Sequence, residues 1–180
     1  MLSYEPVALA ERPAWVIVAG DVNSTAAVAM VCAKLGIRIV HLEAGLRSFD
    51  RSMPEELNRL VTDVLADLLW TPSPDGDENL RKEGIPAARI ERVGNIMLDS
   101  YELLRGQIES DGTVARLGLE PRGYAVLTLH RPSNVDESRP LRELLGALDD
   151  LARQMPVLFA VHPRTRKRIA EFGMEGLVER

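Results

Sequence analysis

Short runs of β-branched residues alternate with longer amphipathic runs, and this alternation constrains the fold more than any other feature of the chain. Trp15 to Ala19 and Leu68 to Thr71 are typical of buried strands, whereas Ser24 to Leu35 is typical of a helix. A further helix is expected to begin at Pro54, because proline suits the first helical position. We therefore predict an α/β fold with Rossmann-like parallel sheets and helices on both faces.

The same pattern continues through the rest of the chain. The other predicted strands cover Ile37–Leu42, Arg89–Val93, Tyr124–Leu129 and Val157–Val161, and the other predicted helices cover Asp75–Glu83, Ile96–Gln107, Pro140–Arg153 and Arg164–Phe172. Residues 109–123, which are rich in glycine and charge, interrupt this rhythm and are interpreted as a linker. Residues 1–108 are then the C-terminal part of a first Rossmann-like domain, and residues 124–180 the N-terminal part of a second.

Both ends of the sequence suggest that a longer architecture surrounds this chain. The chain enters almost directly on a strand, and the second domain has only two strands, too few for a free-standing parallel sheet. We expect the 180 residues to be the centre of a larger protein, incomplete at both ends.

Composition and charge exclude several classes of function. A net charge of -5 gives no general attraction to nucleic acid or to an anionic membrane, and 4% aromatic residues offer few platforms for stacked bases. No run approaches the roughly 18 apolar residues of a membrane span, and the single cysteine, Cys32, fits a reducing cytoplasm. We expect a cytoplasmic protein with no nucleic-acid or membrane partner. The three histidines lack metal-ligand spacing and no glycine-rich phosphate motif occurs, so neither metal nor cofactor is expected.

Carboxylates gather beside guanidinium groups between His41 and Arg59. Glu43 follows an apolar strand, Arg47 comes shortly after it, and Glu55 stands at the start of the next helix. A carboxylate moves a proton while fixed cations hold a phosphate, so this pattern favours an enzyme acting on an anionic substrate. Arg47 is then a candidate to bind the substrate. A structural interpretation stays open, because a strand-end pair such as Glu43 and Arg47 is more often structural than catalytic. Arg59 is also placed to pair with Glu55 at the surface.

The helix beginning at Pro54 carries apolar residues spaced by threes and fours, and these are expected to form its buried face: Leu57, Leu60, Val61, Val64, Leu65 and Leu68. Glu55 lies on the opposite side, so we expect it to point into water or into a cleft facing another domain. Glu56 is explained by the favourable dipole of the first helical turn.

Polar residues also follow the first predicted strand. Ligands of open parallel sheets bind beyond the carboxyl ends of strands, where helix N-termini present free N–H groups. Asp21 is therefore a candidate to act on a substrate, with Asn23 and Ser24 binding its hydroxyls or phosphate. The alternative is that Asp21 or Asn23 only caps the following helix.

Two histidines end the strands of the second domain. His130 is followed by Arg131, and His162 by a proline and an arginine. A histidine beside an arginine can protonate a leaving group or pair with a diphosphate. An anion site and a purely structural role both remain open for this pair.

Six motifs occur in a fixed order: GDVNSTAA, HLEAGLRS, MPEELNR, VGNIMLDS, TLHRPSNVD and VHPRT. Over nearly the whole chain, this series resembles the non-hydrolysing bacterial UDP-N-acetylglucosamine 2-epimerases. The resemblance implies a two-domain, glycosyltransferase-B-like architecture with the active site between two Rossmann-type domains. It also implies the interconversion of UDP-GlcNAc and UDP-ManNAc by elimination and re-addition of UDP.

The resemblance assigns roles residue by residue. It implies four catalytic residues: Asp21, Glu43, Glu55 and His130. Which carboxylate removes the proton stays open. Arg131 and His162 match positions of a second, regulatory UDP-GlcNAc site, although Pro132-Ser133 departs from the Arg-Glu of some members. The implied partners are a UDP-sugar and a second copy in a homodimer, or else a complementing chain.

Three alternatives accompany this interpretation. A hydrolysing UDP-GlcNAc 2-epimerase would release UDP and free ManNAc, and a non-catalytic fragment would only bind nucleotide sugars. A retaining glycosyltransferase is more distant. The family's basic N-terminal loop and its later Ser-Gly-Gly segment are not found in the sequence, so the chain alone is expected to be weak or inactive.

Overall fold

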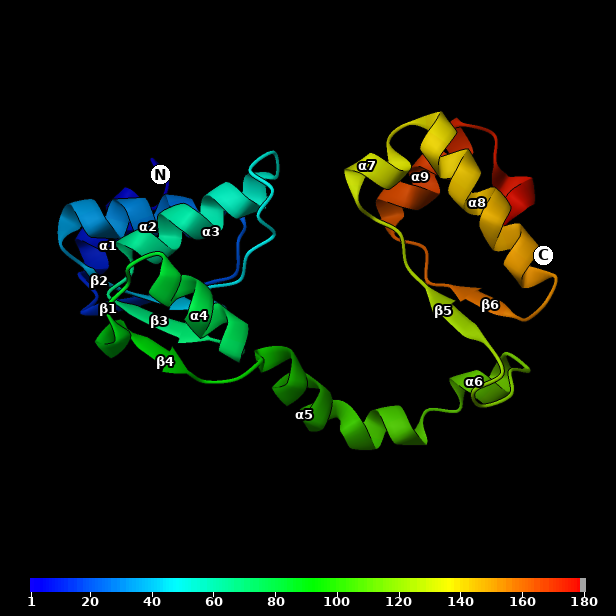
Figure 1. The fold of residues 1–180 in the computed structure, drawn as a ribbon, viewed down its shortest axis with the longest axis horizontal. Coiled ribbons are helices and arrows are strands. Elements are labelled where there is room, and N and C mark those ends of the chain that lie inside the picture. Colours follow the sequence, from blue (N-terminus) through cyan, green and yellow to red (C-terminus); the bar gives the residue numbers. More distant parts are fainter. Residues whose placement is uncertain (179–180) are drawn as a thin grey trace. The chain divides into compact units, whose positions relative to one another are not determined.

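The structure is a computed structural model that describes residues 1–178. Internal contacts divide the chain into two compact units, Met1–Arg105 and Gly106–Arg180. Both units contain parallel β-sheet and helices (Figure 1), so the predicted α/β class with parallel sheets is confirmed.

The first unit is built on a four-stranded parallel sheet of order β1-β2-β3-β4. Its strands are β1 (Trp15–Ala19), β2 (Arg38–Leu42), β3 (Leu68–Thr71) and β4 (Ile90–Arg92). Its helices are α1 (Glu5–Glu11), α2 (Asn23–Leu35), α3 (Pro54–Leu65), α4 (Pro74–Lys82), the 3-10 helix η1 (Ala87–Arg89) and α5 (Ile96–Ser110), which runs on into the second unit. Parallel pairing brings the carboxyl ends of β1, β2 and β3 to the same edge of the sheet.

The second unit contains a two-stranded parallel sheet, β5 (Ala125–Leu127) and β6 (Val157–Phe159). Its helices are α6 (Thr113–Arg116), α7 (Pro132–Val135), α8 (Ser138–Ala152), α9 (Pro163–Glu171) and the 3-10 helix η2 (Glu175–Leu177). The short helix α6 falls inside the segment interpreted as a linker.

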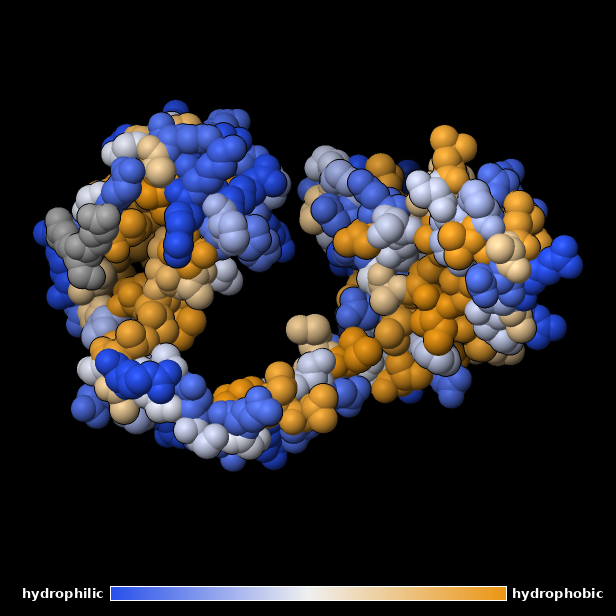
Figure 2. All heavy atoms as spheres, turned by 180° about the vertical axis from the view of Figure 1, so that it is seen from behind, coloured by the Kyte–Doolittle hydropathy of each residue, from blue (hydrophilic) through white to orange (hydrophobic). Residues whose placement is uncertain are grey.

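Each unit has its own apolar core. The first core consists of Val18, Ala29, Cys32, Ile39, Ala44, Ala66, Leu69 and Leu80. The second consists of Val135, Leu141, Leu145, Ile169 and Met174. Apolar side chains also reach the surface of both units (Figure 2), among them Ile17 on β1 and Val126 on β5. Among residues 1–178, no helix combines the length and the apolar character that a membrane span requires.

Helix α1 corrects the expectation that the chain enters almost directly on a strand. It begins with Glu5 in the first turn and Pro6 near its start, both favourable at a helix N-terminus. Ala8 is buried, and Tyr4, just before the helix, packs against the first core.

Helix α3 corrects the prediction of its buried face. It buries Thr62 and Asp63 together with Glu56, whereas Leu57 is 48% exposed and Val64 is 67% exposed. The face toward α2 and the sheet is therefore largely polar, although Leu65, one of the residues predicted to be buried, packs against the first core. Leu68, also predicted for this face, lies on β3. Apolar spacing mispredicts it because the buried polar groups are hydrogen-bonded, which offsets the cost of burying them. Thr62 donates to the Asn58 carbonyl within the helix, whereas Asp63 and Glu56 find partners on other segments.

Candidate active site

Two carboxylates stand at adjoining strand ends in the first unit. Asp21 comes two residues after β1, and Glu43 immediately follows β2. Gly20 and Glu43 both have left-handed backbones, with φ of 64° and 69°. A methyl group added to Gly20 would lie only 3.5 Å from Oε2 of Glu43. The carboxylate of Glu43 therefore lies over the turn that leads into Asp21.

Residues of α3 hold the loop that follows β1. The guanidinium of Arg59 pairs with the Asp21 carboxylate. The side-chain amide of Asn58 donates to the Asp21 carbonyl at 2.8 Å and to Oδ1 of Asn23 at 2.9 Å. The N-cap of α2 is Val22, which has no side-chain cap, so the alternative that Asp21 or Asn23 caps this helix is wrong.

Glu55 lies on the face of α3 that meets Asp21. It precedes Asn58 by three residues and Arg59 by four, and residues so spaced share one side of a helix. Arg59 pairs with Asp21 and Glu56, so the surface pair considered for Glu55 and Arg59 is replaced by these partners. Glu55 itself is exposed, as is Ser24 in the first turn of α2.

Glu56 anchors the loop that precedes α3. Its carboxylate accepts from the Ser48 backbone at 2.9 Å, the Ser48 hydroxyl at 3.0 Å, the Phe49 backbone at 3.1 Å and Arg59 at 3.0 Å. Burial opposes its ionisation, but the hydrogen bonds from Ser48, Arg59 and Phe49 outweigh burial and hold the pKa of Glu56 below its ordinary value. A helix-dipole explanation misses this role, because the Ser48 and Phe49 donors come from outside the helix.

Arg47 is occupied by carboxylates inside the protein. Its side chain is 1% exposed and pairs with Asp63 at 2.7 Å and with Glu83 through two hydrogen bonds, of 2.7 and 2.6 Å. Burial disfavours the charge, but Glu83 and Asp63 overcome this effect and raise the pKa of Arg47 above its ordinary value. Arg47 lies in the same loop as Glu43, and its guanidinium is held inside the protein by Asp63 and Glu83.

The predicted histidines of the second unit lie side by side. The ring centroids of His130, which follows β5, and His162, which follows β6, are 5.7 Å apart. Nδ1 of His162 accepts from the backbone N–H of Arg164 at 3.2 Å at the start of α9. Both histidines and Arg131 are exposed. The two rings and Arg131 can therefore meet an anion from solvent.

Asp136, at the end of α7, joins that helix to α9 and was given no role in the sequence analysis, although it ends the motif TLHRPSNVD. Its carboxylate pairs with Arg164 and with Arg168. The pKa of Asp136 is lowered, chiefly by the hydrogen bond from Arg164. The hydroxyl of Thr165 donates to the Leu129 carbonyl, which joins α9 to the segment leading into His130.

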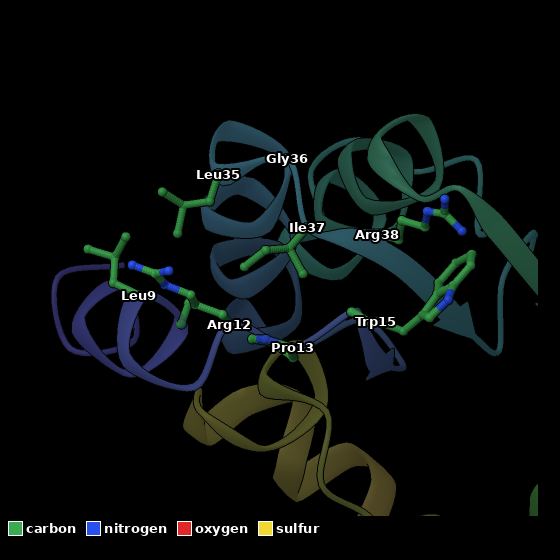
Figure 3. Close-up of a pocket in the computed structure, with 10 residues that line it drawn as sticks. Leu9, Arg12, Pro13, Trp15, Leu35, Gly36, Ile37 and Arg38 are labelled. Atoms are coloured by element: carbon green, nitrogen blue, oxygen red, sulfur yellow. The ribbon is translucent and has the colours of Figure 1, made fainter.

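A pocket of about 610 Å³ lies at the opposite end of β1 and β2 (Figure 3). Its lining includes Arg12, Trp15, Ile37 and Arg38, and the Arg38 guanidinium lies 5.2 Å from the Trp15 ring centroid. These residues are at the amino ends of the strands, whereas the candidate carboxylates follow their carboxyl ends. This pocket therefore does not include Asp21 or Glu43.

Known proteins resemble the chain along nearly its full length. A sequence model of a family described as UDP-N-acetylglucosamine 2-epimerase matches residues 1–178. The chain is 38% identical to a UDP-N-acetylglucosamine 2-epimerase of Methanococcus maripaludis, over 99% of this chain and 50% of that protein. It is 39% identical to a UDP-2,3-diacetamido-2,3-dideoxy-D-glucuronate 2-epimerase of Pseudomonas aeruginosa, over 97% of this chain and 49% of that protein.

Among solved structures, a similar fold occurs in the Methanocaldococcus jannaschii UDP-GlcNAc 2-epimerase crystallised in complex with UDP-GlcNAc and UDP. The TM-score is 0.85 at 37% identity, over 97% of this chain and 49% of that chain. The chain thus spans about half the length of the relatives it matches.

Proposed function

The chain belongs to the UDP-N-acetylglucosamine 2-epimerase family, and from this membership we propose that its protein inverts the second carbon of UDP-GlcNAc to give UDP-ManNAc without net hydrolysis. The observation that carries the proposal is the placement of Asp21 and Glu43 at adjoining strand ends, with Glu55 on the helix face that meets Asp21. A cluster of carboxylates is what proton transfer at a carbon requires.

The reaction must remove a weakly acidic proton. A carboxylate takes the proton from the second carbon of the sugar while the bond from the first carbon to UDP breaks, which leaves a 2-acetamidoglucal. UDP then returns to the first carbon, and a proton is delivered to the opposite face of the second. We propose that Asp21, Glu43 and Glu55 share these proton transfers. Arg59 keeps Asp21 oriented through their ion pair.

The departing diphosphate needs cations and donors. We propose that His130 protonates or pairs with it, and that Arg131 and His162 bind phosphate nearby. At the start of α2, Asn23 and Ser24 stand at a helix N-terminus, where free N–H groups favour an anion. For Arg47 the buried pairs favour a role in holding the loop that carries Glu43 over direct contact with substrate.

A second candidate substrate has comparable support. The identity to the UDP-2,3-diacetamido-2,3-dideoxy-D-glucuronate 2-epimerase, 39%, is similar to that of the UDP-GlcNAc enzyme, 38%. Both substrates are UDP-sugars that are inverted at the same carbon, so the carboxylate cluster would serve either. The two are separated by comparing kcat/KM on each UDP-sugar.

The test follows the sugar in deuterated water by NMR. We expect UDP-ManNAc to form from UDP-GlcNAc, weakly for this chain on its own, with deuterium at the second carbon. Free ManNAc together with UDP would identify a hydrolysing epimerase instead. Binding of UDP-GlcNAc without deuterium incorporation or product would refute epimerisation and identify a protein that only binds nucleotide sugars.

A further inference from the structure

His41 is a fully buried histidine two residues before the candidate carboxylate Glu43. It lies on β2 with 0% of its surface exposed. Its Nε2 atom is 3.0 Å from the carbonyl oxygen of Gly20, and its Nδ1 atom is 2.5 Å from Oδ1 of Asp63 on α3. The ring therefore joins the end of β1 to α3.

The partners of His41 determine where its protons are. A carbonyl oxygen only accepts hydrogen bonds, so Nε2 must carry a proton toward Gly20. The other oxygen of Asp63 accepts from the Gly45 backbone N–H at 3.2 Å and pairs with Arg47 at 2.7 Å. A carboxylate that accepts in this way from an N–H group and a guanidinium is ionised and carries no proton. The proton between Asp63 and His41 therefore belongs to the ring, and Nδ1 must donate as well.

The charges around the ring balance. His41 with two N–H groups and Arg47 are cations, and Asp63 and Glu83 are the anions that face them. A buried charge is tolerated when it is paired and hydrogen-bonded in this way. Loss of the Nδ1 proton would leave Asp63 without its nearest donor inside the protein.

The network ties together the two loops that carry the candidate catalytic carboxylates. Through the Gly20 carbonyl it holds the residue directly before Asp21, and through Asp63 it holds Gly45, two residues after Glu43. Each bond ends on backbone, so it fixes the path of the loop and with it the direction of the neighbouring side chain.

We propose that His41 is a positioning residue: as a buried imidazolium locked by Asp63, it sets the relative placement of Asp21 and Glu43. The importance of this placement for catalysis rests on the proposed function. The protonation of His41 is independent of that function. His41 has no exposed surface and takes no part in the proposed proton transfers, so its effect on the reaction is exerted through these two loops.

The protonation of His41 is measured by NMR on protein labelled with ¹⁵N in its three histidines. His130→Asn and His162→Asn change exposed residues and assign those two resonances, which leaves His41 by elimination. We expect both ring nitrogens of His41 to carry protons at neutral pH, because each faces an oxygen that accepts. A single unprotonated ring nitrogen on His41 at neutral pH overturns the imidazolium.

The positioning role is tested by Asp63→Asn, which keeps the size and hydrogen-bonding capacity of the side chain but removes its charge. We expect Nδ1 of His41 to become an acceptor and the backbone amide resonances of Asp21 and Glu43 to shift. The matched control is Asp67→Asn, because Asp67 accepts from the Ile39 backbone at the other end of β2. Unchanged Asp21 and Glu43 resonances in folded Asp63→Asn protein overturn the proposal.

Turnover gives a third readout. In Asp63→Asn we expect kcat to fall about tenfold or more, as for residues that orient catalytic groups, with KM unchanged. An unchanged kcat overturns the positioning role. If the unaltered protein turns over neither UDP-sugar, the proposed function fails, and the two NMR measurements still decide the imidazolium and the loop positions.

Discussion

Asp21 and Arg59 form an ion pair across 38 residues of sequence, joining the end of the first strand to α3. The same guanidinium donates to Glu56, which in turn holds the backbone of Ser48 and Phe49. One arginine thus connects a candidate catalytic carboxylate to the loop between β2 and α3. The polar face of α3 organises this end of the sheet.

Removing the charge of Glu43 should abolish most proton transfer. Glu43→Gln keeps the size of the side chain, and we expect deuterium incorporation at the second carbon of the sugar to fall about 100-fold or more. The unfolding midpoint should change little. Glu109→Gln is the matched control on an exposed carboxylate of α5. Equal incorporation rates in both variants would exclude Glu43 from the chemistry.

Replacing Arg59 should impair Asp21 indirectly. Arg59→Met keeps the length of the side chain but frees Asp21 from its partner, and we expect kcat/KM to fall about tenfold. Arg59→Lys, which keeps the charge, should recover part of the loss. Arg139→Met serves as control, because it breaks only an exposed pair with Glu143. A loss no larger than in this control contradicts the role given to Arg59.

Glu56 should contribute stability that depends on pH. Its folded pKa lies below the ordinary 4.5, so its contribution is fully present above that value and is lost as pH falls through the lowered folded pKa. Glu56→Gln should therefore destabilise the protein by about 1–3 kcal/mol at neutral pH. Urea titrations at several pH values should show this difference shrinking below about pH 4.5. A constant difference would show that ionised Glu56 is not the source.

Gly45 should tolerate no side chain. Its φ is 80°, and a β-carbon there would meet the Gly76 carbonyl carbon at 2.8 Å. We expect Gly45→Ala to destabilise the protein by about 2–5 kcal/mol from combined strain and overlap. Gly84→Ala shares the left-handed backbone, with φ of 84°, but has open space, so it isolates the strain, about 1 kcal/mol. Equal unfolding free energies for the two variants would contradict the overlap.

The exposed apolar face of α3 should contribute little to folding. Val64→Ser changes a side chain that is 67% exposed, and we expect an effect within about 0.5 kcal/mol. Leu69→Ala, in the core and 0% exposed, should cost about 2–5 kcal/mol in the same urea titration. A large effect of Val64→Ser would show instead that this apolar face of α3 is buried, as the spacing predicts.

The strands were predictable because their signal is local. Trp15–Ala19 and Leu68–Thr71 match β1 and β3, since a short β-branched run between turn residues needs no distant information. The neighbouring positions of His130 and His162 follow from the same logic, because equivalent ends of adjacent parallel strands must lie together.

The polar interior was not predictable in this way. Periodicity scores Thr62 and Asp63 as surface residues, whereas Asp63 is buried because His41 and Arg47 meet it there. Those partners are 22 and 16 residues away along the chain. Hydrophobic spacing reports how apolar each face is, but it carries no information about which distant charges a face will meet.

At Glu43, the residue type that would best suit the left-handed backbone differs from the one that supplies a carboxylate. Side chains other than glycine pay about 1–2 kcal/mol for this conformation, and Glu43 adopts it at φ 69°. Glycine would relax the turn while deleting the carboxylate. Laboratory selection for heat resistance alone should therefore favour Glu43→Gly, a more stable variant that lacks the carboxylate proposed for proton transfer.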